Sequence, residues 1–106
     1  MFARCVSIFL EADSIALFTR TINEEVIPLL RKQKGFIDEI VITVPGGTEV
    51  VGISLWDRKE NLEHYSRDTF PQVQKTLANV IEGTPVVQIY EVTSSTFPKI
   101  AAHAAV

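Results

Sequence analysis

Cysteine and histidine are scarce in this sequence of 106 residues, which has one cysteine and two histidines. A single cysteine cannot close an intrachain disulfide, and Cys5 stands inside an apolar stretch, where we expect it to be a small buried hydrophobe. We therefore expect a reducing, cytoplasmic environment. Zinc and iron sites need several converging His, Cys or carboxylate ligands, and Cys5, His64 and His103 lack the spacing of such ligands. The sequence predicts no metal site.

Clusters of positive charge, long apolar runs and phosphate-binding glycine loops are also missing. The net charge is -3, and Lys and Arg gather only within residues 31–34, at a predicted helix end where cations complement the helix dipole. No apolar run approaches the roughly 20 residues of a membrane span, and no signal-like segment opens the sequence. Gly46 and Gly47 suit a hairpin rather than a dinucleotide fingerprint. We expect neither nucleic acid nor a membrane as a partner.

Three stretches, at residues 40–44, 50–56 and 86–90, are apolar almost throughout. Antiparallel sheets usually have one solvated face and show polar alternation, so strands without it predict a sheet that is covered on both faces. A chain of this length has helices to cover one face only. We therefore predict a homodimer, in which a second copy covers the other face.

The predicted elements follow a βαββαβ order within a single domain over residues 1–106. Strands are predicted at residues 2–10, 36–44, 49–56 and 86–92, and the middle two are joined by a short glycine-containing hairpin connection. This order is the ferredoxin-like arrangement, an α+β fold with a four-stranded antiparallel sheet. The tail at residues 93–106 is expected to dock on the partner subunit.

Two helical regions connect the strands. The first starts at Asp13 or Ser14 and places apolar residues at steps of three and four, and Pro28 predicts a kink or an early end. The second starts with Asp57 as N-cap in capping-box spacing and ends before Gly83.

Two segments carry a resemblance to a known family. One is the stretch PLLRKQKGF at residues 28–36, and the other is a strand that ends in Trp56 before a helix with His64, Tyr65 and Phe70. Both resemble the antibiotic biosynthesis monooxygenase family. The resemblance covers nearly all of the chain, and residues 80–85 and 90–97 are similar to an uncharacterised subgroup. It implies two ferredoxin-like subunits that press their sheets together into a dimeric α/β barrel. It also implies a range of activities, from cofactor-free oxygenation of phenols, anthrones or quinols to haem degradation or simple metabolite binding.

The aromatic residues after the third strand are the first candidates for a site. Trp56 serves as a wall for a flat ligand, with its indole N–H as donor, or as a core residue that plugs the sheet. Tyr65 stands where many relatives carry a histidine; its hydroxyl orients a substrate or transfers a proton, or else reaches solvent. His64 lies one position earlier, about 100° around the helix, and is either a general base or a surface residue.

Arg4 is the second type of candidate, because a charge inside an apolar strand is costly unless it is paired. It holds an anionic or phenolate ligand, or it forms a structural ion pair with Glu91, with Asp38 and Glu39 as further options. Ser54 and Phe70 complete the candidate substrate-binding set.

Two functions remain open. The first is a cofactor-independent monooxygenase of a small electron-rich aromatic such as a quinol or anthrone, with Tyr65 and His64 as catalytic residues. The second is a non-catalytic dimer that binds a small hydrophobic metabolite. Haem is not expected as a cofactor, because Lys75 stands where haem-degrading relatives carry their axial histidine and lysine is a poor iron ligand.

Overall fold

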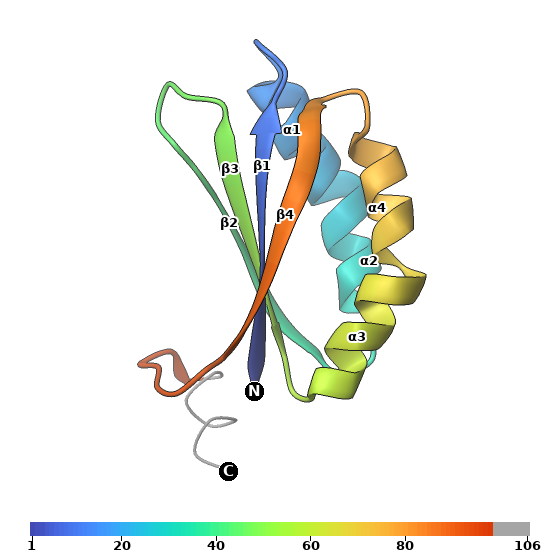
Figure 1. Cartoon of the computed structure of the whole chain (residues 1–106), viewed down its shortest axis with the longest axis vertical. Helices are drawn as coiled ribbons and strands as arrows, with labels where there is room; N and C mark the ends of the chain where they lie inside the picture. Colours follow the sequence, from blue (N-terminus) through green and yellow to red (C-terminus); the bar gives the residue numbers. More distant parts are fainter. Residues whose placement is uncertain (99–106) are drawn as a thin grey trace.

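The computed structural model describes residues 1–98. A four-stranded antiparallel sheet carries helices on one face (Figure 1). The strands are β1 (Phe2–Leu10), β2 (Phe36–Thr43), β3 (Glu49–Trp56) and β4 (Ile81–Glu91), in the spatial order β2-β3-β1-β4. Helices α1 (Ile15–Thr21), η1 (Ile22–Val26) and α2 (Ile27–Arg31) follow β1, and helices α3 (Lys59–Asp68) and α4 (Phe70–Leu77) follow β3. The predicted ferredoxin-like α+β fold is confirmed.

The register of the sheet decides which side chains face the helices. Arg4 on β1 lies opposite Ser54 on β3, and Ser54 lies opposite Glu39 on β2. Residues that are directly opposite in a sheet point to the same face. These three polar side chains therefore form one row across the helix-covered face.

A bulge at the start of β2 sets the orientation of that strand. Phe36 pairs with Trp56, but the next paired residue is Asp38, opposite Leu55. The extra residue, Ile37, reverses the alternation, because successive side chains in a strand point to opposite faces. As a result Asp38 faces away from the helices and Glu39 faces them.

Pro28 modifies the first helical region without ending it. Proline has no N–H to donate to the carbonyl of Glu24, four residues earlier. The turn before it is a π-helix, in which the N–H of Ile27 bonds to the carbonyl of Ile22, five residues back. The helix then continues as α2, so the expected break is instead a widened turn.

The second helical region differs from the prediction at both ends. Its N-cap is Arg58, and no side chain caps it; Asp57 instead accepts a hydrogen bond of 2.8 Å from Asn61 Nδ2. Its last helix ends at Leu77, and β4 starts at Ile81 rather than at residue 86. Gly83, with φ of +78°, lies inside this strand, which an edge strand with an irregular register tolerates.

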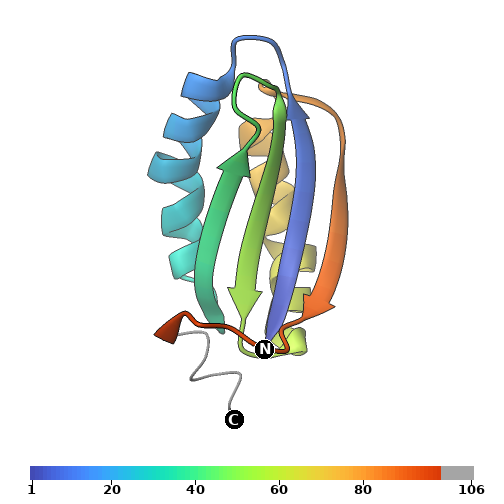
Figure 2. The same ribbon diagram turned by 90° about the vertical axis from the view of Figure 1, so that its left-hand side faces the viewer.

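The other face of the sheet has no helix over it (Figure 2). Its side chains include large hydrophobic residues that are about half exposed, among them Phe9, Ile40, Ile42, Val86 and Tyr90. The dimeric barrel that would cover this face stays a prediction. The predicted docking of the tail concerns residues 93–106, most of which lie outside the described residues; Phe97 is 62% exposed. None of the helices within residues 1–98 is long and apolar enough to cross a membrane.

Candidate functional site

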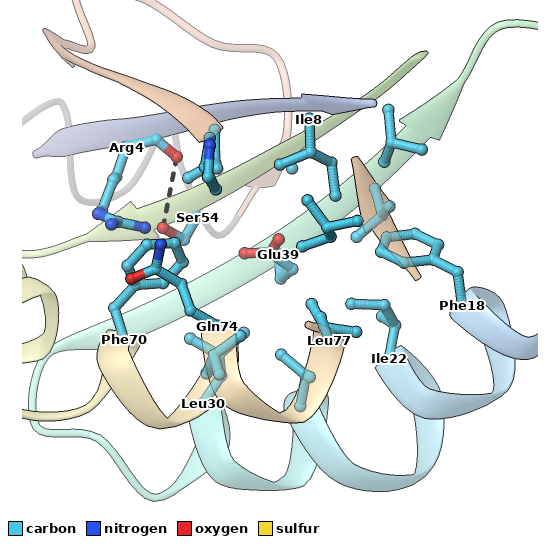
Figure 3. Close-up of a pocket in the computed structure, with 18 of the residues that line it drawn as sticks. Arg4, Ile8, Phe18, Ile22, Leu30, Glu39, Ser54, Phe70, Gln74 and Leu77 are labelled. Carbon is cyan, nitrogen blue, oxygen red and sulfur yellow. Dashed lines mark hydrogen bonds between the residues drawn. The ribbon is translucent and has the colours of Figure 1, made fainter. Parts of the chain in front are cut away.

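A cavity lies between the sheet and the helices (Figure 3). Its volume is about 580 Å³, open solvent at the mouth included, and the part that admits the centre of a water molecule is several times smaller, so the space is narrow. One end is apolar and is lined by Ile8, Phe18, Ile22 and Leu77. The other end carries the polar and aromatic side chains Arg4, Ser54, Tyr65 and Phe70. Such a combination is typical of small-molecule sites, in which a few polar groups orient an apolar ligand.

Arg4 is the charged residue of the polar end and is only 3% exposed. Its Nε donates a hydrogen bond of 2.8 Å to Ser66 Oγ on α3, and its guanidinium carbon lies 4.0 Å from the centroid of the Phe70 ring and 5.4 Å from that of Tyr65. These contacts compensate part of the cost of burying the charge. Burial lowers the pKa of Arg4, and the nearby Tyr65 and Glu39 oppose this change.

An ion pair of Arg4 with Glu91, one of the two interpretations that the sequence left open for Arg4, does not form. In the observed register Glu91 lies opposite Phe2, and Arg4 lies opposite Ile89. Within residues 1–98, no ion pair involves Arg4, and no side-chain hydrogen bond engages its two terminal nitrogens. These two nitrogens are therefore the donors that Arg4 has left for a ligand.

Trp56 and Tyr65 stack against each other, with ring centroids 5.0 Å apart. Tyr65 lines the cavity, whereas Trp56 is fully buried and is not part of its wall. The indole N–H donates to Ser54 Oγ at 2.9 Å, so of the two interpretations that the sequence left open for Trp56, the structure supports the core residue. Of the two aromatic candidates, Tyr65 therefore lines the cavity, and Trp56 supports Tyr65 and Ser54 from behind. Burial raises the pKa of Tyr65 to about 12, so its hydroxyl stays protonated near neutral pH.

His64 lies on the exposed side of α3 and does not line the cavity. The 100° step along the helix separates it from Tyr65. Phe70 lies at the start of α4, where it is half-buried beneath Arg4. Within residues 1–98, no group of three or more His, Cys, Asp and Glu side chains is placed to hold a metal ion; that the protein binds none stays a prediction.

Glu39 is the carboxyl group of the cavity, and the sequence identified it only as an option for pairing with Arg4. It occupies the centre of the space in Figure 3, between the polar and the apolar ends. Burial raises the pKa of Glu39 to about 8, and Arg4 opposes this change. Near pH 7 the carboxyl is therefore mostly protonated, and the charge of Arg4 has no full counter-charge in the cavity.

Two further lining residues were missed by sequence reasoning. A Cβ atom at Gly52 would lie 3.3 Å from Glu39 Oε1, so the bare glycine forms the floor on which the carboxyl rests. Gln74, on α4, adds a neutral amide to the polar end. A glycine inside an apolar strand is the signal that could have found the first, because such glycines mark places where another group approaches closely.

The sequence matches no family model and no curated protein. Solved structures do match over most of the chain. A monooxygenase from Streptomyces coelicolor, in complex with nanaomycin D, superposes with a TM-score of 0.75 at 15% identity and covers 92% of this chain and 91% of its own. An antibiotic biosynthesis monooxygenase gives a TM-score of 0.69 at 13% identity, with 87% and 98% covered.

This chain has the fold of the antibiotic biosynthesis monooxygenases. A protein of unknown function from Nitrosomonas europaea shares it as well, with a TM-score of 0.74, 12% identity and coverage of 92% and 93%. At these identities the likeness establishes the fold, and the chemistry has to be argued from the cavity.

Proposed function

We propose that this protein is a cofactor-independent monooxygenase of a small, electron-rich hydroxyaromatic compound such as an anthrone or quinol. The observation that carries the proposal is the narrow apolar cavity that holds a buried arginine with two free donor nitrogens at one end. A flat aromatic suits its apolar walls, and an aryl oxide oxygen suits Arg4. The Streptomyces coelicolor monooxygenase of the same fold supports the reaction class.

The chemistry requires only that the substrate be held as its anion. An anthrone that has lost a proton donates an electron to dioxygen, and the radical pair then combines. One oxygen atom enters the ring carbon as a carbonyl, and the other leaves as water. Arg4 and the protonated Tyr65 hydroxyl stabilise the negative charge on the substrate oxygen, which is the largest contribution a preorganised site makes. The apolar walls exclude water.

We further propose that the chain works as a homodimer whose uncovered sheet faces pack against each other. Many half-exposed aliphatic and aromatic side chains lie on that one face, and exposed apolar surface of this kind marks an interface. Sedimentation should give about twice the chain mass of 11.8 kDa. Ile42→Lys on this face should yield monomers, while Leu17→Lys, on exposed helix α1, should not; a wild-type monomer would refute the dimer.

The test of the activity is oxygen uptake and product mass with a panel of anthrones and naphthoquinols. Consumption of one O₂ per anthrone, with the corresponding anthraquinone as product, is the expected result. Binding of the same compounds without oxygen uptake would favour the alternative, a non-catalytic dimer that binds a small hydrophobic metabolite. A matched control is the oxidation of each compound in buffer, since anthrones react slowly with oxygen on their own.

A further inference from the structure

The proposed reaction needs a base, and His64, for which the sequence left the roles of general base and surface residue open, lies outside the cavity. Tyr65 is protonated near neutral pH because burial raises its pKa to about 12. Among the described residues that line the cavity, Glu39 is the one carboxyl group. It lies in the same row as Arg4 with Ser54 between them, and two strand spacings separate their Cα atoms by about 10 Å. At that separation an aromatic ring can lie between the guanidinium of Arg4 and the carboxyl group of Glu39.

A second feature connects the same carboxyl to the outside. Glu39 also lines a groove at the β2 edge, between β2 and helices α1 and η1, together with Thr19, Asn23 and Thr43. The space within this groove is about 750 Å³, open solvent included. The rest of the groove lining is apolar, from Phe18, Ile22, Ile27 and Val41. A carboxyl that belongs to both the inner cavity and an outer groove with some polar residues in its wall is placed to exchange its proton with water.

We propose that Glu39 is the general base of the cavity: its carboxylate removes the acidic proton of a bound hydroxyaromatic compound and releases that proton through the groove at the β2 edge. This inference rests on the proposed function for the identity of the ligand. In the step, an oxygen of Glu39 forms a bond to the proton, and the electron pair of the broken C–H or O–H bond stays on the substrate as an aryl oxide. Arg4 holds that oxide. Glu39, now a carboxylic acid, loses its proton to water.

The charged groups around Glu39 are consistent with this role. Arg4 on β1 favours the carboxylate, and burial disfavours it, which leaves the pKa near 8. Cys5 on the far face of β1 and Tyr65 on α3 also interact with its charge. The cavity- and groove-lining residues of β3, α4 and η1, including Asn23, are uncharged. A base is most effective when its pKa lies near the working pH.

The experiment follows proton removal without oxygenation. Anthrone is incubated with the protein in D₂O under nitrogen, and deuterium in its methylene group is measured by mass spectrometry. The wild-type protein should accelerate exchange, with a midpoint near pH 8. Glu39→Gln should slow the catalysed exchange by about 100-fold or more, a typical loss for a general base, while anthrone binding changes less than threefold.

Glu39→Asp should keep part of the exchange, because it retains a carboxylate further from the ligand, and His64→Gln should match the wild type. Full exchange in Glu39→Gln, or loss of exchange in His64→Gln, overturns the assignment of Glu39, as does a wild-type protein that binds anthrone and catalyses no exchange. If exchange depends on Glu39 but the protein takes up no oxygen in air, the proposed monooxygenase activity is wrong and the role of Glu39 as the base stands. The two failures are therefore distinguishable.

Discussion

Glu39 should make the stability of this protein depend on pH in a way that a single substitution removes. The pKa of its carboxyl rises from 4.5, its ordinary value, to about 8 in the folded chain because of burial. Between these two pH values the folded chain holds a proton that the unfolded chain has released. The free energy of unfolding therefore falls as the pH rises through this window.

The size of the effect follows from the two pKa values. One pKa unit corresponds to about 1.36 kcal/mol, so the stabilisation that is present below pH 4.5 falls by up to about 5 kcal/mol by the time the pH passes 8. The loss is spread over the window at no more than about 1.4 kcal/mol per pH unit. Glu39→Gln, which cannot ionise, should lack this contribution and gain stability relative to the wild type as the pH rises.

Urea unfolding of the wild type and of Glu39→Gln at half-unit steps from pH 4.5 to 9 measures the difference directly. Glu82→Gln, at an exposed position on β4, is the matched control and should run parallel to the wild type. If the curves of the wild type and Glu39→Gln run parallel as well, the carboxyl titrates as it does in water and the described burial of Glu39 is wrong.

Three further predictions concern a tight turn, the core behind the cavity and the charge of Arg4. Gly35→Ala should destabilise the protein by more than about 2 kcal/mol in thermal unfolding, because φ is +81° and a Cβ atom would collide with Asp57 and Asn61. The control Gly46→Ala, with φ of +71° and open space around it, should cost only about 1 kcal/mol. Equal losses in the two variants would contradict the close approach at Gly35. Trp56→Phe should cost about 2–4 kcal/mol in urea unfolding, because it removes the hydrogen bond from the indole to the buried Ser54 hydroxyl and leaves a void. A loss below about 0.5 kcal/mol would show that the indole is not part of the core. Arg4→Met should weaken binding of 2-naphthoate by about tenfold or more and leave naphthalene binding unchanged, and equal effects on both ligands would mean that Arg4 does not contact the anionic oxygen.

The sequence predicted the sheet well because its strands carry strong patterns. β1 and β3 have the expected bounds, and the hairpin between β2 and β3 follows from Pro45 and the two glycines after it. β4 was predicted to start at residue 86 because Gly83 and Pro85 usually end an element. It starts earlier, since an edge strand does not need the N–H that proline lacks.

The candidate site was predicted only in part, and the reason is register. The orientation of Glu39 depends on the bulge at Ile37, and no local pattern in the sequence marks that extra residue. The surroundings of Arg4 also depend on tertiary structure. The register of β1 with β4 places Glu91 opposite Phe2, and helices α3 and α4 bring Ser66 and Phe70 to Arg4. The different orientations of His64 and Tyr65 were predictable, because successive residues of a helix point about 100° apart.

The central claim is that this cavity directs dioxygen onto an aromatic anion, and an isotope experiment tests it most directly. Anthrone is converted under ¹⁸O₂ in ordinary water, and the mass of the anthraquinone is measured. The account predicts one ¹⁸O atom in each product molecule at a rate well above that in buffer, and a loss of that excess in Glu39→Gln. An anthraquinone that carries no ¹⁸O, or bound anthrone that is never converted faster than in buffer, would contradict it.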